Sequence, residues 1–322
     1  MNQYPLNNIK PEVLKKIAQG VLNTYQLDSL KEINIIKALE NEMVDLEALN
    51  EGNDAQSLAA VRVRRALDES VTDEMLMPTV FEYNDGLLIL ARVCRNDADE
   101  TLIEVFSDQV LNIEILKKVM PSIITAFSWC TAKYISVWAK PNSSAEKELL
   151  ALPGSLGCDS FIAADKHQVL LETDSQLSIR AFNLENDWPW YENEYNAFLK
   201  ENPHMKHIVP ISEKDEIEEA VDNNLCACAL LGSTVIGMVM AEASQELGYK
   251  GLLFSDIFIT GAFRGKGLAS PMQRLFIKEK LAEFELFSGF IDKNNLASIK
   301  NAAKQGRQLL RQEICLPTQL LV

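Results

Sequence analysis

The spacing of apolar residues changes from a helical period to a strand period at about residue 79. In residues 10–70, apolar side chains recur every three or four positions, which is typical of amphipathic helices. Polar turn residues, Asp28-Ser29 and the stretch 51–54, separate these runs. The chain is therefore predicted to begin with a helical region of three segments, at 13–25, 30–49 and 57–67.

The pattern after residue 79 predicts strands alternating with helices. Asp85-Gly86 separates two apolar runs and is a two-residue hairpin signal. The predicted strands are 79–84, 87–95, 101–107, 133–139, 160–164 and 168–173, with helices at 112–129 and 143–152.

A similar order of elements returns from Leu177 onward. It comprises a strand at 177–182, helices at 188–199 and 212–223, and strands at 226–232, 234–243 and 250–260. A glycine-containing turn, a helix to about residue 284, a strand at 285–291 and a helix at 297–305 follow, and a strand-like pair at 309–314 and 316–322 closes the chain.

The repeated order predicts two domains, since 322 residues exceed the usual size of one. The boundary is placed at 174–176, which gives a first domain over 1–175 and a second over 176–322. The predicted fold class is α/β of the α+β type. Each domain is expected to hold a mixed, mostly antiparallel sheet flanked by helices, with the helical region at the N-terminus of the first.

Composition excludes several classes of function. A net charge of −15 disfavours nucleic-acid binding and favours amine or cationic substrates only modestly, because an excess of carboxylates is also common in soluble proteins. No apolar run approaches the length of a membrane span, so we expect no membrane association and a cytoplasmic location. Scattered cysteines without metal-ligand spacing predict buried thiols and no metal site; they are Cys94, Cys130, Cys158, Cys226, Cys228 and Cys315.

A turn rich in glycine and basic residues links the strand at 250–260 to the following helix. Its sequence, Arg264-Gly265-Lys266-Gly267, places backbone N–H groups at a helix N-terminus, which is a binding site for phosphate. The P-loop pattern fails here because its spacing is one residue short and Gly267 replaces the hydroxyl residue. The dinucleotide pattern GxGxxG is weak because Ser270 stands in the last place.

A third pattern, Arg264-x-x-Gly267-x-Ala269, resembles the pyrophosphate-binding turn of the GNAT superfamily of N-acetyltransferases. Asn295-x-x-Ser298 also resembles that family's last strand–helix unit. The resemblance implies that acetyl-CoA is the cosubstrate, that Ile257, Phe258 and Ile259 bind its pantetheine arm through main-chain groups, and that Asn295 contacts the arm from the other side. It also implies that Arg264 belongs to the motif and that the amides of Gly265, Lys266, Gly267, Leu268, Ala269 and Ser270 bind the pyrophosphate. The alternative is a tight strand-to-helix link without a ligand.

The catalytic groups are less defined. The position of the family's acidic Tyr is Ala302, and the positions of its carboxylates are Ile257 and Phe290. The substitutes are Asp256 and Glu242 as bases and Tyr249 as acid, although each is also explained by a structural role. Two functions remain open: an N-acetyltransferase acting on a small-molecule or peptide amine, and a CoA-binding module without activity. A third possibility is a transferase with a longer acyl donor, because the sequence does not reveal the pocket at the thioester end.

Three further features have alternative interpretations. The aromatic helix (Trp188, Trp190, Tyr191, Tyr195) could line an acceptor pocket or pack into the core. His204 and His207 could form a metal pair or lie in a surface loop. The first half lacks the glycine turn and has Asp108 in its place, so it is predicted not to bind CoA in the same way and to serve as a scaffold, an acceptor-site wall or the surface of a homodimer.

Overall fold

The computed structural model describes residues 1–50, 55–65, 67, 69–96, 100–172, 176–206 and 208–321. Within them the chain forms two compact units. The first unit contains Met1–Leu27, Asn34–Asp159 and Leu310–Val322, and the second contains Asp28–Ile33 and Ser160–Leu309. The predicted boundary at 174–176 falls at Asp174 and Ser175, outside the described residues.

The sheet of the first unit is antiparallel apart from one parallel pair. Its strands follow the order β1-β2-β3-β4-β5-β12, and only β4 and β5 run parallel. The strands are β1 (Asn2–Pro5), β2 (Thr79–Glu82), β3 (Leu88–Arg95), β4 (Thr101–Ser107), β5 (Tyr134–Ala139) and β12 (Gln308–Pro317).

The helices of the first unit follow the predicted periodicity. Leu14, Ile17 and Val21 recur at helical spacing and bury one face of α1, while Asn112 caps α5 by accepting a hydrogen bond from Ile115 N. These helices are α1 (Pro11–Leu22), α2 (Ile35–Ala48), α3 (Ala55–Arg65), α4 (Asp73–Leu76), α5 (Ile113–Ala126) and α6 (Ser144–Leu150). The predicted turn at 51–54 lies outside the described residues.

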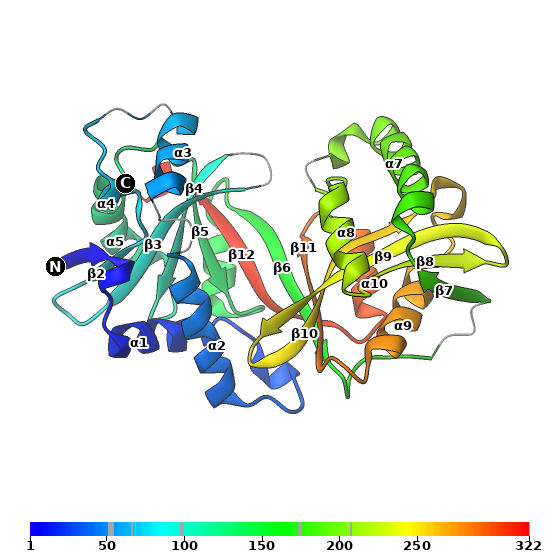
Figure 1. Cartoon of the computed structure of the whole chain (residues 1–322). Coiled ribbons are helices and arrows are strands. Elements are labelled where there is room, and N and C mark those ends of the chain that lie inside the picture. Colours follow the sequence, from blue (N-terminus) through cyan, green and yellow to red (C-terminus); the bar gives the residue numbers. More distant parts are fainter. Residues whose placement is uncertain are drawn as a thin grey trace. The chain divides into compact units, whose positions relative to one another are not determined.

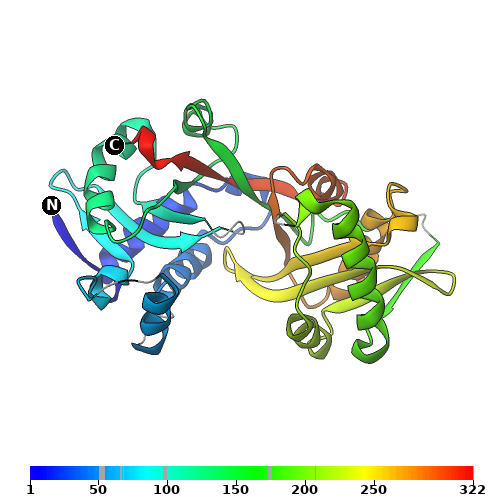
Figure 2. The same ribbon diagram turned by 90° about the horizontal axis from the view of Figure 1, so that it is seen from above.

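The sheet of the second unit has the order β6-β11-β10-β9-β8-β7, with one parallel pair between β10 and β11 and antiparallel pairs from β10 to β7. In the views of Figures 1 and 2, α7 and α8 cover one face of this sheet and α9 lies on the other. The elements are β6 (Leu156–Asp165), β7 (Leu177–Ala181), β8 (Cys226–Leu231), β9 (Thr234–Glu246), β10 (Tyr249–Ile259), β11 (Leu286–Asp292), α7 (Leu184–Glu201), α8 (Lys214–Asp222), α9 (Ala269–Lys280) and α10 (Leu296–Ala303).

Each sheet takes its sixth strand from the other half of the sequence. β6 follows β5 along the chain but lies next to β11 in the second unit, and β12 follows β11 but pairs with β5 in the first. Ile314 and Leu316 of β12 are fully buried in the core of the first unit. A single cut of the chain therefore does not separate the two compact units, because each half of the sequence contributes one strand to the other unit.

Two sequence expectations about elements are wrong, and one strand has no counterpart among the predicted elements. Residues 168–172 form no strand; they connect β6 to the next part of the chain, and Leu170 N donates to Gln305 O. The closing pair at 309–314 and 316–322 is one continuous strand, β12, followed by a short 3-10 helix at Thr318–Leu320. The short strand β1 lies before the first predicted helix and pairs with β2.

The cysteines are only in part buried thiols. Cys226, Cys228 and Cys315 are buried, whereas Cys94, Cys130 and Cys158 are half-buried. The ligand atoms of Cys158, Cys315 and Glu313 in the first unit lie within 4.8 Å of one another, so the expected absence of a metal site stays a prediction. No helix in the described ranges is both long and apolar enough to span a bilayer.

Because β12 completes the core of the first unit, Ile314→Ala should destabilise that unit by roughly 2–5 kcal/mol, the usual effect of truncating a fully buried aliphatic side chain. Urea unfolding in a Trp188→Phe/Trp190→Phe background would report on the first unit through its own Trp129 and Trp138. Ile36→Ala, at a side chain that is 71% exposed, is the matched control and should change stability by less than about 0.5 kcal/mol. An unchanged first unit would contradict the assignment of β12.

Candidate active site

A β-bulge in β10 sets the orientation of the side chains around the candidate site. Phe254 pairs with Ala241 but Asp256 pairs with Met240, so Ser255 is an extra residue. Because neighbouring residues of β9 face opposite sides of the sheet, the bulge places Phe254 and Asp256 on opposite faces. The ring of Phe254 lies 6.3 Å from that of Phe276 on α9, whereas Asp256 accepts a hydrogen bond from Tyr191 on α7.

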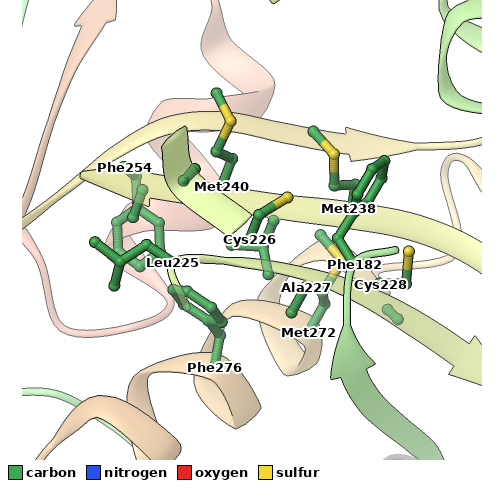
Figure 3. Packing of buried hydrophobic residues seen from close by; sticks show 14 of the residues in the cluster. Phe182, Leu225, Cys226, Ala227, Cys228, Met238, Met240, Phe254, Met272 and Phe276 are labelled. Carbon is green, nitrogen blue, oxygen red and sulfur yellow. The ribbon is translucent and has the colours of Figure 1, made fainter. Parts of the chain in front are cut away.

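The packing around β9 is consistent with this assignment of faces. Figure 3 shows Phe254 on the same side as Phe276 and Met272 of α9, while Met238 and Met240 point to the other side. A Cβ at Gly237 would lie 3.3 Å from the sulfur of Met272, which places odd-numbered residues of β9 on the α9 face. Asp256 and Phe258, opposite Met240 and Met238, therefore belong to the α7–α8 face.

The parallel pair β10–β11 separates at the bulge. The register runs from Gly251↔Leu286 to Leu253↔Ser288, and no further pair between these strands occurs in the described part of the chain. Thr260 N donates to Ile236 O, so the backbone groups of even-numbered residues after the bulge face β9. Those of Ile257 and Ile259 consequently face the opening, where they form a short strand edge without a partner strand, although Ile259 O accepts a hydrogen bond from Arg264 Nε.

A cavity of about 1040 Å³ lies at this opening within the second unit. It extends from the α7–α8 face, through the gap between the parted strands, to the α9 face. Among the residues around it are Glu216, Glu219 and Glu242 on the first face, Asp256, Ile257, Phe258 and Ile259 of β10, Gly289 and Phe290 of β11, Ala269 and Gln273 of α9, Asn295 and Asn301 near α10, and Arg307.

The glycine turn lies beside this cavity, between the lining residues Arg264 and Ala269. Gly265 and Gly267 have φ values of +74° and +75°, which residues with a Cβ rarely adopt, and a Cβ at either position would point into open space. The amides of residues 265–270 make no hydrogen bond to any described residue. Pro271 has no N–H, and no side chain caps α9. The turn therefore presents a row of free donors at the positive end of a helix.

Ser270 adds a hydroxyl to this row. Its side chain is 7% exposed, and its Oγ has no hydrogen-bond partner among the described residues. A buried hydroxyl without a partner is unfavourable in isolation. A phosphate oxygen at the turn would supply the missing acceptor.

Arg264 folds away from the row of amides. Its Nε donates to Ile259 O at 2.6 Å, and its guanidinium lies over the ring of Phe198, 3.8 Å from the centroid, on the α7 side. Partial burial lowers the pKa of Arg264. This side chain therefore holds the end of β10 in place while it lines the cavity.

Asp256 is the buried carboxyl group of the cavity wall, with 8% of its surface exposed. Its Oδ2 accepts hydrogen bonds from Tyr191 OH at 2.6 Å and Ser212 Oγ at 3.2 Å, and Ser212 N donates to Tyr191 OH at 3.0 Å. Burial raises the pKa of Asp256 to about 6, despite the opposing effect of these donors. Asp256 is thus an acid–base group poised near neutral pH.

The other predicted catalytic residues lie in different surroundings. Glu242 is exposed at the mouth of the cavity near Glu216 and Glu219, and its partial burial and these two carboxylates raise its pKa. Tyr249, at the opposite end of β10, does not line the cavity, and burial raises its pKa to about 12. The structure thus gathers both predicted bases at one site and separates the predicted acid from them.

The remaining sequence candidates divide between site and core. Asn295 lines the cavity and caps α10 by accepting from Ser298 N at 3.2 Å. Of the aromatic helix, Tyr195 reaches the cavity, but its hydroxyl donates to Val209 O and Pro210 O, whereas Trp188 and Trp190 pack against the core. His204 lines the cavity, and His207 lies outside the described residues.

Two contributors to the site have no sequence signal. Ser212 precedes α8 and completes the hydrogen bonds of Asp256, and Arg307 follows Gly306 in a turn. Both lie near the site only because of tertiary packing. An isolated Ser or Arg in a loop carries no periodicity or motif that could have identified it.

The corresponding turn of the first unit is closed. A Cβ at Gly20 of α1 would lie 1.9 Å from Ser107 O and 2.6 Å from Asp108 Cα, so α1 packs directly on the end of β4. The Asp108 carboxylate accepts from Leu88 N at 3.0 Å. A negative side chain and a packed helix thus stand where the second unit has free amides; that the first unit does not bind CoA in the same way stays a prediction.

Comparison with solved structures identifies the fold. A GCN5-related N-acetyltransferase from Sphaerobacter thermophilus is 13% identical, with a TM-score of 0.53, and the match covers 98% of this chain and 94% of that one. A GNAT-family acetyltransferase from Colwellia psychrerythraea is 11% identical, with a TM-score of 0.48 over 82% of this chain and 97% of that one. Neither a family model nor a curated protein matches the sequence. The first of these two matches, with its TM-score above 0.5, shows that the chain has the GNAT fold, as its sequence motif predicts.

The raised pKa of Asp256 predicts a pH-dependent effect of Asp256→Asn on stability. The pKa of Asp256 is about 6 in the folded state, against an ordinary value of 3.8 for the carboxyl group. Ionised Asp256 therefore opposes folding above pH 6, and this cost disappears as the pH falls towards 4. Asp256→Asn should therefore stabilise the protein at pH 8 by up to roughly 3 kcal/mol, with no gain at pH 4.

Urea unfolding of the wild-type protein and of Asp256→Asn, each at pH 4 and pH 8, would measure this effect. All other titratable groups contribute equally to the stability of the two proteins. Asp222→Asn, at an exposed carboxylate on α8, is the control and should show no such difference. A lower stability of Asp256→Asn at pH 8 would mean that ionised Asp256 stabilises the fold, contrary to the assigned shift.

Proposed function

We propose that the protein is an acyl-CoA-dependent N-acyltransferase, with acetyl-CoA as the simplest donor and an amine as the acceptor. The second unit carries the site. The observation on which the proposal rests is the row of free amides at residues 265–270, next to an unpaired strand edge that leads to Asp256.

The features of the second unit fit each part of CoA. The amides of residues 265–270 and Ser270 Oγ would bind the pyrophosphate, with Lys266 adding positive charge. The groups of this edge that have no partner, Ile257 O and Ile259 N–H, would pair with the amides of the pantetheine arm, as a strand edge pairs with a peptide. Asn295 lines the other side of the same cavity. When bound, acetyl-CoA supplies the thioester whose acyl group is transferred.

Asp256 would act as the general base. It lies at the bulge, where the strand edge begins, and its carboxylate is available above pH 6 to accept a proton from an acceptor amine. Tyr191 and Ser212 hold the carboxylate in a fixed orientation through their hydrogen bonds. The N–H of Ile259 faces the open edge and would stabilise negative charge on the reacting carbonyl oxygen, whereas the N–H of Ile257 interacts with the Asp256 carboxyl group.

The acceptor would approach from the α7–α8 face. Glu216, Glu219 and Glu242 line this side of the cavity and create a negative field there. Such a field concentrates cationic molecules, and amines are protonated in solution near neutral pH. We therefore propose a small-molecule or peptide amine with a further positive charge, rather than nucleic acid, as the partner of this site, in a cytoplasmic setting.

Gly267→Glu tests the binding of the pyrophosphate. A carboxylate in this turn would repel the diphosphate, so CoA affinity measured by isothermal titration calorimetry should fall at least about tenfold. Gly232→Glu is a matched control, because Gly232 has a φ of +62° in the β8–β9 turn and also faces open space. Equal CoA affinity of Gly267→Glu and Gly232→Glu would rule out the turn as the phosphate site.

Asp256→Asn tests the chemistry. Release of free thiol from acetyl-CoA, followed with a panel of polyamines, aminoglycosides, amino acids and peptides, should identify an acceptor. With that acceptor, kcat should rise with an apparent pKa of about 6, and Asp256→Asn should lower kcat about 10²–10⁴-fold without changing CoA affinity. Glu242→Gln, at the cavity mouth, should keep the pH midpoint of the wild-type protein.

The alternative function, a CoA-binding module without activity, differs from the proposed transferase in one experimental result. Two positions lack a proton carrier. Ala302, which is fully buried in α10, has no hydroxyl group, and Phe290 is apolar. Tight CoA binding without thiol release for any amine of the panel would favour a CoA-binding module over a transferase.

A further inference from the structure

Arg307 is a buried cation at the point where β10 and β11 separate. Its side chain is 4% exposed and lines the cavity. Its Nη2 donates to Gln273 Oε1 at 2.9 Å, and its Nη1 lies 3.5 Å from the carbonyl oxygen of Ser288, the last residue of β11 that pairs with β10. The guanidinium also lies 4.6 Å from the ring centroid of Phe254.

No carboxylate of the described residues neutralises this charge. Arg307 forms no ion pair with them, and its Nε has no hydrogen-bond partner. Burial alone lowers the pKa of Arg307 to about 9, with no opposing effect from a nearby acid. A buried unpaired charge is costly, and in a chain with 46 acidic residues the lack of a partner leaves the site ready for an external anion.

Polar groups around Arg307 add further donors. Ser288 Oγ is buried without a partner, and Gln273 Oε1 already accepts from both Arg307 and the Nε2 of Gln305. Gln305 Oε1 is the one buried acceptor of this group that lacks a donor. Arg307, which lines the cavity, thus retains an unused donor, whereas Ser288 is not among the lining residues.

Gly289 gives the cavity access to the guanidinium. A Cβ at this position would lie 3.5 Å from Arg307 Nη1 and 3.5 Å from Phe254 O, so the missing side chain leaves space between the two strands. Gly289 itself lines the cavity. A group that follows the open edge of β10 towards the separation point would therefore end at Arg307.

The face on which Arg307 lies identifies the ligand to which the anion belongs. Arg307 contacts Gln273 of α9 and Phe254 on the α9 face, the same side as the row of amides at the start of α9. The acidic side chains and Asp256 lie on the opposite face, where the acceptor would approach. An anion at Arg307 is therefore part of the acyl donor rather than of the acceptor.

We propose that Arg307 binds a carboxylate at the far end of the acyl group, so that the preferred donor is the CoA thioester of a short dicarboxylic acid such as succinate. This inference rests on the proposed function. In the reaction, the acceptor nitrogen forms a bond to the thioester carbon, the carbon–sulfur bond breaks, CoA leaves as the thiol with the proton that the amine loses, and the carboxylate at Arg307 is unchanged. Arg307 is thus a specificity-determining residue for the acyl chain.

Binding of CoA, butyryl-CoA and succinyl-CoA, measured by isothermal titration calorimetry, tests the proposal without knowledge of the acceptor. Butyryl-CoA matches the chain length of succinyl-CoA but lacks its charge. Succinyl-CoA should bind about 10–100-fold more tightly than butyryl-CoA, the range expected for a buried charge-assisted pair. Arg307→Gln should abolish this ratio and leave the affinity for CoA unchanged.

Two further variants separate recognition from folding. Arg274→Gln removes a guanidinium of α9 that donates to Glu172 O and Lys304 O and does not line the cavity. This variant should keep the wild-type ratio of the affinities for succinyl-CoA and butyryl-CoA. Gly289→Ala adds a methyl group at ordinary contact distance, so the protein should fold normally and lose part of the preference for succinyl-CoA. Thermal unfolding of each variant would verify that it is folded.

Each other result overturns a distinct statement. Equal affinities for butyryl-CoA and succinyl-CoA in the wild-type protein would refute the role of Arg307 and leave the proposed function intact. An equal loss of affinity for all three ligands in folded Arg307→Gln would show that Arg307 contacts the CoA portion, which also refutes the proposal. No binding of any of the three ligands to the wild-type protein would refute the proposed function itself.

Discussion

The separation of β10 from β11 is the constraint on which the site depends. Backbone N–H and C=O groups inside a protein are normally paired, yet the pairing of these strands ends at Leu253 and Ser288 while β10 continues to Ile259. The extra residue Ser255 accompanies this separation and turns the side chains that follow it to the other face. A cavity, an unpaired strand edge and a buried carboxyl group therefore occur at one place, because they result from the same irregularity of the sheet.

The two faces of the second unit differ in charge, as the acyl transfer that we propose would require. The α9 face offers free amides, Ser270 Oγ and Arg307, which are all donors suited to an anionic carrier. The α7–α8 face offers the glutamates at the cavity mouth, which favour a cationic acceptor. Asp256 lies where these two environments meet. The net charge of −15 therefore conceals a local excess of donors that only the fold reveals.

The first unit shows that the same strand order does not by itself produce the open turn found in the second unit. Its sheet repeats the antiparallel run followed by a parallel pair, and β4 and β5 also share only three residue pairs. However, α1 packs on the end of β4 through Gly20, and the side chain of Asp108 binds the backbone of Leu88. The difference between the units arises from local side chains and helix packing. The exchange of β6 and β12 means that each unit nonetheless needs both halves of the sequence to complete its sheet.

The sequence by itself determined most local features: the helical N-terminal segments, the order of most strands and helices, and the position of the glycine turn before α9. These features depend on short-range periodicity and backbone preference, which a linear sequence carries. Only the tertiary structure decided that β12 belongs to the first unit, that Tyr249 lies away from Asp256, and that Ser212 and Arg307 join the site. These outcomes depend on contacts between residues far apart in the chain, and a side chain without a periodic or motif context gives no signal of its distant partners. The physical reason is that burial and hydrogen-bond pairing, which set the pKa of Asp256 and leave Arg307 without a counterion, exist only after the chain has folded.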